Sequence, residues 1–355
     1  MKVALLLTAS FLSLIPAAGS GQIAHTGPVA EVTGVGNVLH MIADLNRSMA
    51  FYRDTLGFKV NRAPRGPADD PTAYIKALPN IPPMYLLAED GMYRSAEMFL
   101  SSPAVRLELE DFKGRAPNAV HPRLVDSGAT VLMLWVKDVD AVLKAVTQAG
   151  AEVVSAGKKP VTMKAESGSQ RILFVKDPDG FLIEFIQPSP LPASAASAEQ
   201  NAFNTGLAVS VNDLDYTTNF FRERFGFQVR EGADFVTDQP YLDAAGLMKG
   251  VRVRRASTTV PGSSFPVEFM EFQGTERKGI FPAIHDPGGT MLRIGIRDMP
   301  STVKNLRAAG IPINSTLGEP MGPNGNLIVR APDGLFLQLT AGGGGRGRNE
   351  LAPSR

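Results

Sequence analysis

The stretch DLNRSMAFYRDTLGF at residues 44–58 returns later in the chain as DLDYTTNFFRERFGF at residues 213–227. In each copy the leading Asp is expected to cap a helix, because its short side chain accepts hydrogen bonds from the first free backbone N–H groups. The glycine near the end of the stretch stops the helix, and the apolar residues after it begin a strand. The two copies predict a duplicated domain.

Shorter matches follow in the same order in both halves: Asp126–Gly128 with Asp286–Gly288, Asp138 with Asp298, Ala149–Gly150 with Ala309–Gly310, and Pro178–Gly180 with Pro332–Gly334. Within each half, a strand, an Asp-capped helix and further strands occur twice. In the second such unit a strand at 131–136 precedes the helix, and a turn at 177–180 joins the last two strands. The chain is therefore predicted to be α+β, with four βαβββ modules in series.

This pattern resembles the vicinal oxygen chelate superfamily, which includes glyoxalase I, bleomycin-resistance proteins, extradiol dioxygenases and methylmalonyl-CoA epimerase. The matching segments, with their counterparts in the second half, are Asp44–Phe58, Leu107–Phe112, Asp138–Gly150 and Asp177–Gln187. The resemblance implies two vicinal-oxygen-chelate (glyoxalase-like) domains. Each would consist of two paired modules that close a U-shaped sheet around a cavity, with helices on the outer face.

The repeat also predicts the domain boundaries. Domain 1 is expected at residues 31–188 and domain 2 at residues 202–340. Pro, Ala and Ser dominate the stretch between them, so residues 189–201 are expected to form a linker. Residues 341–355 are Gly-rich and end in Arg and Pro, which predicts a disordered tail.

The N-terminus has the pattern of a secretory signal peptide at residues 1–20. Lys2 precedes an apolar run at residues 3–15, and Ala18 and Ser20 fit a signal-peptidase site. The run is too short to span a membrane, and a span of about 18 apolar residues is not found elsewhere in the sequence. We therefore expect a secreted or periplasmic protein without a membrane partner.

Composition excludes several classes of function. The chain has 36 Lys and Arg against 35 Asp and Glu, so it lacks the basic excess that nucleic-acid binding requires. It has no Cys, which excludes disulfides, thiolate zinc sites, iron–sulfur clusters and cysteine nucleophiles. It also lacks a phosphate-binding loop, and we expect no nucleotide or flavin cofactor.

The resemblance further implies where metal ligands stand: at the start of the first strand and in the last strand of each module. These positions hold Asn37, Glu108, Val131 and Glu184 in the first half, and Gly206, Glu268, Met291 and Gln338 in the second. The first-strand positions lack the family's usual histidine. Oxygen ligands suit hard cations such as Mn or Mg, and Zn or Fe are further candidates. We therefore predict a divalent metal held by Asn37, Glu108 and Glu184 in the domain-1 cavity.

Other side chains share the parity of the cavity face, because alternate residues of a strand point to the same side. Arg106, Trp135 and Arg293 are on this basis candidate substrate-binding residues. Each also has a structural alternative: an exposed polar edge for Arg106, core packing for Trp135, and pairing with Glu268 for Arg293. His40 lies three residues from Asn37, an odd spacing, and should pack under the helix layer instead.

Three functions remain open. In the first, the protein is a metal-dependent lyase, isomerase or dioxygenase, with Glu184 and Glu108 as catalytic residues that hold the metal, one of them also moving a proton. In the second, it is a non-catalytic protein that binds or sequesters a small molecule, as bleomycin-resistance proteins do. In the third, it has a structural or partner-binding role. The absence of histidine ligands favours the second function, and the pair of glutamates favours the first.

Overall fold

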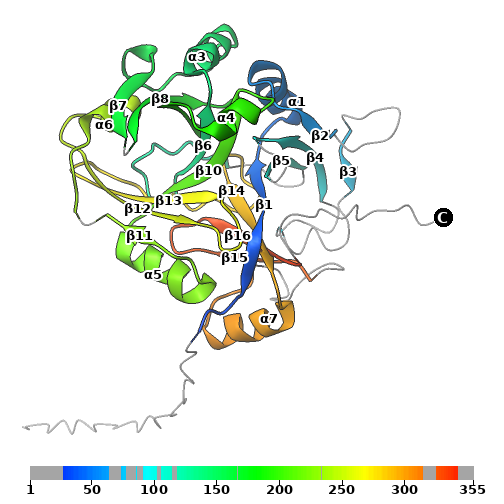
Figure 1. Ribbon diagram of the computed structural model, residues 1–355. Helices are drawn as coiled ribbons and strands as arrows, with labels where there is room; N and C mark the ends of the chain where they lie inside the picture. Colours follow the sequence, from blue (N-terminus) through cyan, green and yellow to red (C-terminus); the bar gives the residue numbers. More distant parts are fainter. Residues whose placement is uncertain are drawn as a thin grey trace, which may run out of the picture.

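The computed structural model describes residues 27–63, 73–76, 85, 91–101, 105–113, 118–165, 167–232, 234–314 and 325–342. Two mixed β-sheets of eight strands each stand side by side, with helices around their outer faces (Figure 1). This arrangement confirms the predicted α+β class. The predicted signal peptide lies outside the described residues, and so does the predicted tail beyond residue 342.

The strands of the first module are β1–β5, of the second β6–β9, of the third β10–β13 and of the fourth β14–β16. One sheet unites the first and fourth modules, and we call it the outer-module sheet. Its order is β15 (Leu327–Arg330), β16 (Phe336–Ala341), β14 (Thr290–Ile296), β1 (Val32–Met41), β5 (Arg106–Lys113), β4 (Met92–Phe99) and β2 (Val60–Arg62), with β3 (Ile75–Lys76) paired to β4.

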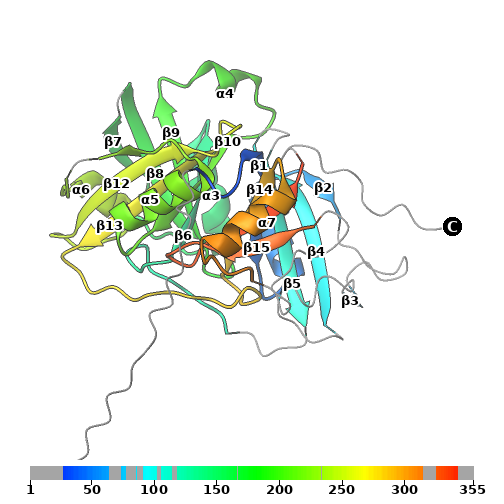
Figure 2. The same ribbon diagram turned by 90° about the horizontal axis from the view of Figure 1, so that it is seen from below.

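The other sheet unites the second and third modules, and we call it the inner-module sheet. Its order is β11 (Arg230–Glu231), β12 (Arg252–Thr259), β13 (Pro266–Gln273), β10 (Ala202–Ser210), β6 (Thr130–Val136), β9 (Leu182–Ser189), β8 (Gly168–Lys176) and β7 (Val161–Ala165). Figure 2, seen from below, separates this sheet from the outer-module sheet.

The pairing of modules differs from the expectation that each sequence half closes its own sheet. The first strand β1 pairs with β14 of the second half, and β6 pairs antiparallel with β10 of the second half. The segment after β9, which contains the short helix α4 (Ala193–Ser197), returns the chain directly to β10 beside β6. Each sheet is therefore shared between the two halves. The boundaries at residues 188 and 202 stay predictions.

Asp side chains begin the four helices for which they were predicted. Asp44 caps α1 (Leu45–Met49), which continues as a π-helix over Ala50–Thr55; the other three caps begin α3 (Val139–Gln148), α5 (Leu214–Phe225) and α7 (Met299–Ala308). Gly226 ends α5 with a φ of 68°, a left-handed conformation that glycine adopts without strain. The remaining helices are α6 (Gln239–Ala244) and a 3-10 turn at Ala156–Lys158.

The apolar faces of these helices pack on the sheets. Around α5, for example, the ring of Phe221 lies 4.8 Å from that of Phe269 on β13 and 5.1 Å from that of Phe227. Within the described residues, none of the helices has the length and apolarity needed to cross a membrane.

Candidate functional site

The outer-module sheet gathers four predicted site residues: Asn37 from β1, Arg106 and Glu108 from β5, and Arg293 from β14. Asn37 donates a hydrogen bond to Glu108 Oε2 at 3.1 Å, and Arg106 Nε donates to Asn37 Oδ1 at 3.2 Å. Arg293 Nη2 lies 3.1 Å from the same Glu108 oxygen, and Arg62 Nη2 lies 2.8 Å from the other. Both carboxylate oxygens of Glu108 are therefore bound by protein cations.

This ionic network determines the charge of Glu108. Burial by itself would raise the pKa of Glu108, but Arg293 and Arg62 outweigh it and hold the pKa below its usual range. A divalent metal at Glu108 would have to displace both guanidinium groups, so a metal does not fit the residues as they lie. Arg293 pairs here with Glu108 and Gln338, and not with Glu268 as the sequence suggested.

Glu184 lies in the other sheet, so the expectation that it shares a cavity with Glu108 is wrong. Their strands would have met only if β1 and β6 paired within one half, whereas each joins a strand of the other half. The neighbouring carboxylate is that of Glu268 on β13. The two glutamates face a cavity of about 250 Å³, whose walls also include Met133, Trp135, Met163, Ile172, Tyr241 and Arg255.

Glu184 has an unusual environment for a carboxyl group. Its residue is 5% exposed, and within the described part of the chain its carboxyl group has no hydrogen-bond or ion-pair partner. Burial raises the pKa of Glu184 to about 8, and the nearby Glu268 adds to the increase, while Arg255 opposes it. At neutral pH this carboxyl group is therefore mostly protonated and can donate a hydrogen bond into the cavity.

Arg255 is the second polar group in this cavity. Its guanidinium lies 3.8 Å from the ring centre of Tyr241, and its Nε is 3.1 Å from Glu268 Oε1. Its Nη1 donates a hydrogen bond to Asp238 Oδ2 at 3.3 Å. The contact with Glu268 has ion-pair distance without good hydrogen-bond geometry, so the buried Nε and Nη2 have no hydrogen-bond partner. Buried polar groups are nearly always hydrogen-bonded, so a partly unsatisfied guanidinium beside an unpartnered carboxyl group marks a place where a ligand can bind.

The first-strand positions of this cavity supply no metal ligand. Val131 is apolar, and Gly206 lies so close to its neighbours that an added Cβ would come within 2.8 Å of Met133 Cε and of Pro266. Of the two carboxylates, Glu268 is already paired with Arg255. This set does not fit a divalent metal without displacement of Arg255. Trp135 stands on the cavity wall, where its predicted role in substrate binding stays a prediction.

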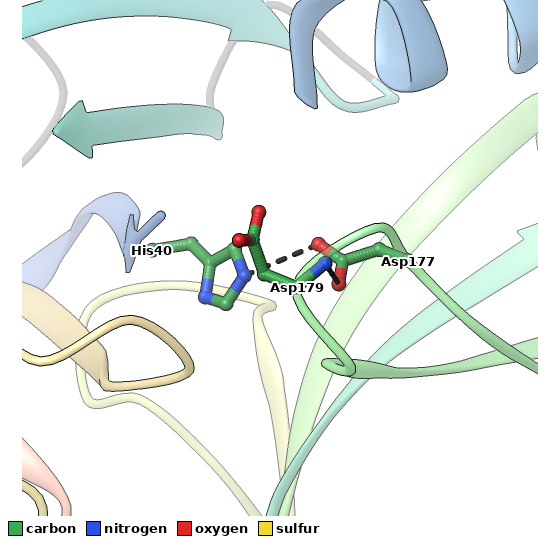
Figure 3. A group of neighbouring side chains, drawn as sticks. All are labelled: His40, Asp177 and Asp179. Atoms are coloured by element: carbon green, nitrogen blue, oxygen red, sulfur yellow. Dashed lines mark hydrogen bonds and ion pairs between the residues drawn. The ribbon is translucent and has the colours of Figure 1, made fainter. Parts of the chain in front are cut away.

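A third group, which the sequence did not single out as a site, joins His40 of β1 to Asp177 and Asp179 in the turn before β9 (Figure 3). Its ligand atoms lie within 4.8 Å of one another, and all three residues are buried. His40 Nε2 lies 3.2 Å from Asp177 Oδ2, and His40 Nδ1 lies 3.2 Å from the carbonyl oxygen of Gly289. Both ring nitrogens thus lie within hydrogen-bond distance of an oxygen atom, so the imidazole is held from both sides.

The carboxylates of this group are also fully bound. Asp177 accepts hydrogen bonds from Tyr52 Oη at 2.9 Å and from the backbone N–H groups of residues 179 and 181. Asp179 accepts from Ser48 Oγ at 2.7 Å, from Arg47 Nη2 at 2.8 Å and from a backbone N–H. The three residues are a candidate metal set by distance, but their donor atoms are saturated by protein. They fit a buried polar clamp between the first and second modules.

The sequence distinguishes the clamp residues through a difference between the two copies of the repeat. By the repeat, the positions of His40, Tyr52 and Asp177 correspond to Val209, Phe221 and Ala331 in the second half. Three polar residues in the first half thus occupy positions that hold apolar residues in the second half. A polar group that the duplicated fold does not need indicates a specific local interaction.

The class of the protein follows from the fold and the sequence together. The profile of the Glyoxalase/Bleomycin resistance protein/Dioxygenase superfamily matches residues 34–185 and again residues 205–339. The chain therefore belongs to this superfamily, with two copies of its domain, which confirms the resemblance inferred from the repeat.

Solved structures share the fold at low sequence identity. A point mutant of glyoxalase I from Zea mays superposes with a TM-score of 0.54 at 18% identity, over 87% of this chain and 93% of that chain. A putative dioxygenase from Bacillus subtilis subsp. subtilis str. 168 gives a TM-score of 0.50 at 9% identity, over 88% of this chain and 86% of that chain. No curated protein sequence matches this chain. At such identities the likeness concerns the fold alone.

Proposed function

We propose that this protein binds a small molecule in the cavity of the inner-module sheet, with Glu184 and Arg255 as the polar groups that recognise it. Two observations on the wall of one cavity carry the proposal. The carboxyl of Glu184 has no hydrogen-bond or ion-pair partner among the described residues, and Nε and Nη2 of Arg255 are buried without a hydrogen-bond partner. The ligand would place an oxygen acceptor between these two donors. Its apolar or aromatic body would lie against Met133, Trp135 and Met163.

The contrast between Glu108 and Glu184 supports this assignment. In the outer-module sheet, arginines bind both oxygens of Glu108, so its charge serves the protein itself. In the inner-module sheet, Glu184 is buried without compensation, which costs folding free energy. Groups that reduce stability without structural benefit are typical of functional sites.

Catalysis at the same cavity is the second candidate. A carboxyl group with a pKa of about 8 is able to move protons near neutral pH, so Glu184 would act as the acid or base in a lyase, isomerase or dioxygenase reaction. A metal-dependent version requires a divalent ion between Glu184 and Glu268 in place of Arg255. A melting temperature that rises with Mn²⁺ in the wild type but not in Glu184→Gln would support the metal-dependent version.

Replacement of Glu184 by Gln should make the protein more stable. The pKa of Glu184 is raised in the folded state, so stability falls as pH rises from about 4.5 to about 8, where the unfolded chain has lost a proton that the folded chain retains. Glu184→Gln removes this penalty, so the free energy of unfolding should rise by about 3 kcal/mol at pH 7. Urea denaturation at pH 5, 7 and 8.5 checks it. A variant less stable than the wild type at every pH would contradict the assigned environment.

Binding can be followed through Trp135, the single tryptophan of the chain, which lines the cavity. We expect 4-nitrobenzoate, a contact quencher with one carboxylate, to quench its fluorescence at saturating concentration. Arg255→Gln should raise the concentration needed for half-maximal quenching by about tenfold, because the ligand loses a hydrogen bond from a charged donor. The matched control is Arg254→Gln, because Arg254 is the neighbouring residue but pairs with Asp215 and Glu271. Equal quenching in Arg255→Gln and in the control would argue against the cavity as the binding site.

Export is part of the proposed function as well. The positive start and apolar run of residues 1–20 predict that the cell secretes the protein or delivers it to the periplasm, with cleavage near Ser20. N-terminal sequencing of the protein from its producing cell tests this. A chain that still begins at Met1 would refute it.

A further inference from the structure

A second pocket, which we call the α5 pocket, lies beside the first turn of α5 and has a volume of about 380 Å³. Tyr216 of α5 forms one wall. Arg277, Lys278 and Phe281, from the segment between β13 and β14, form another. The residues that line it are all different from those of the inner-module cavity. The proposed function makes no use of it.

Two aromatic rings at this pocket are largely exposed to solvent. Tyr216 is 65% exposed and Phe281 is 58% exposed. Phe281 is nevertheless held in place, because its ring rests on the backbone of two glycines: a Cβ at Gly279 would come within 2.7 Å of the ring, and one at Gly334 within 3.4 Å. An exposed aromatic ring with a fixed position is suited to stack against a planar group of a ligand.

The cations of the pocket are not neutralised by the protein. Arg277 donates hydrogen bonds to the carbonyl oxygens of Val211, at 3.0 Å, and Asn212, at 3.3 Å. Carbonyl groups orient a guanidinium without cancelling its charge. Among the described residues, neither Arg277 nor Lys278 forms an ion pair with a carboxylate.

The two acidic residues of the pocket accept hydrogen bonds from neutral donors, which leave their negative charge in place. Asp333 accepts hydrogen bonds from Ser127 Oγ at 3.0 Å, from the backbone N–H of Asn212 at 2.7 Å and from Thr217 Oγ1. Asp213 caps α5 through the backbone N–H of Tyr216 at 2.9 Å. The groups of this pocket that attract an aromatic anion are the two cations and the two rings.

The first half of the chain shows that the fold does not need these residues. By the repeat, Arg47 stands in place of Tyr216, His121 in place of Phe281, and Asn118 in place of Lys278. Arg47 forms an ion pair of 2.8 Å with Asp179, the counterpart of Asp333. The corresponding place in the first half thus uses its cation internally, whereas the second half offers two cations to solvent.

We propose that the α5 pocket binds a small aromatic anion. The ring of the ligand lies against Tyr216 and Phe281, and its carboxylate or phosphate group lies beside Arg277 and Lys278. Aromatic contact and charge neutralisation then act on one molecule, which explains why two bare rings and two unpaired cations occur together. This inference is independent of the function proposed for the inner-module cavity.

Fluorescence anisotropy of naphthalene probes tests the proposal on the full mature chain. We expect 2-naphthoate and 2-naphthyl phosphate to bind, and neutral 2-naphthol to bind about tenfold more weakly or not at all. A rise in salt from roughly 50 to 300 mM should weaken the two anions and leave 2-naphthol unchanged. The anion that binds with the higher affinity shows whether the pocket prefers a carboxylate or a phosphate group.

Variants locate the probe. Tyr216→Ala with Phe281→Ala should weaken binding of the preferred anion by about tenfold, and Lys278→Gln by about threefold. All three residues are at the surface, so melting temperatures should stay near the wild-type value. Arg171→Gln, at an exposed ion pair with Asp140 outside both cavities, is the matched control and should bind normally. In the Arg255→Gln background, where the inner-module cavity is impaired, the probe should still bind in the α5 pocket.

Three results would overturn the proposal: 2-naphthol that binds as tightly as the anions, unchanged anion binding in the Tyr216 and Phe281 double variant, or loss of binding in Arg255→Gln together with a change in Trp135 emission. The last result would place the probe in the inner-module cavity. It would leave the proposed function intact while removing the α5 site.

Discussion

Replacement of Asp177 by Ala should destabilise the protein by about 4 kcal/mol. The change removes the carboxylate 3.2 Å from the buried His40 imidazole and leaves Tyr52 Oη without its acceptor at 2.9 Å. It also removes the acceptor for two backbone N–H groups of the turn before β9. Removing one member of a buried hydrogen-bonded group is costly because the partners left behind have neither protein nor water to replace it. Urea denaturation followed by circular dichroism measures the loss.

The second half of the chain provides the control for this prediction. His40→Val, Tyr52→Phe and Asp177→Ala together copy the residues Val209, Phe221 and Ala331. The triple variant removes all partners of the clamp at once, so it should recover about 2 kcal/mol of the loss. Asp140→Asn, at an exposed ion pair with Arg171, should cost less than about 1 kcal/mol. If the triple variant is as unstable as Asp177→Ala, the three residues of the clamp are not energetically coupled.

Arg293→Met should cost about 3 kcal/mol, because Arg293 joins β14 of the fourth module to β5 of the first. The substitution leaves buried Glu108 with Arg62 as its remaining cation and leaves Gln338 Oε1 without the donor at 2.8 Å. Addition of Glu108→Gln should restore about half of the loss, since it removes the charge that Arg293 neutralises.

The pH dependence of Arg293→Met follows from the lowered pKa of Glu108. A carboxylate with a lowered pKa stabilises the folded state above the pKa of the unfolded chain, about 4.5, and this contribution disappears as pH falls through the folded-state pKa. The difference between wild type and Arg293→Met should therefore shrink below about pH 4. Arg297→Gln, just beyond the same strand, breaks an exposed pair with Glu31 and should change stability by less than about 1 kcal/mol. A loss from Arg293→Met no larger than this control would show that the network is not a unit.

Equivalent places of the repeat serve different purposes in this chain. Arginines bind both oxygens of Glu108 in the outer-module sheet, whereas in the inner-module cavity two nitrogens of Arg255 lack a hydrogen-bond partner. The clamp and the α5 pocket show a divergence of this kind between the two halves. After a duplication, one copy can preserve the packing while the other acquires a binding surface.

Local features of this protein could be predicted from its sequence. The Asp caps, the glycine that ends α5, the number of modules and the side of each strand that faces a cavity follow from residue type and spacing within a few positions. Glu184 and Trp135 were expected to face a cavity on this basis, and both line one.

The partner of each cavity residue was decided only by the tertiary structure. The four modules have similar strands, so the sequence fits β1 beside β6 as well as it fits β1 beside β14, and strand periodicity does not distinguish them. The observed pairing separates Glu184 from Glu108 and brings it to Glu268 and Arg255. Burial then sets the protonation of Glu184, because a carboxyl group loses its charge where neither water nor a closely paired cation stabilises it.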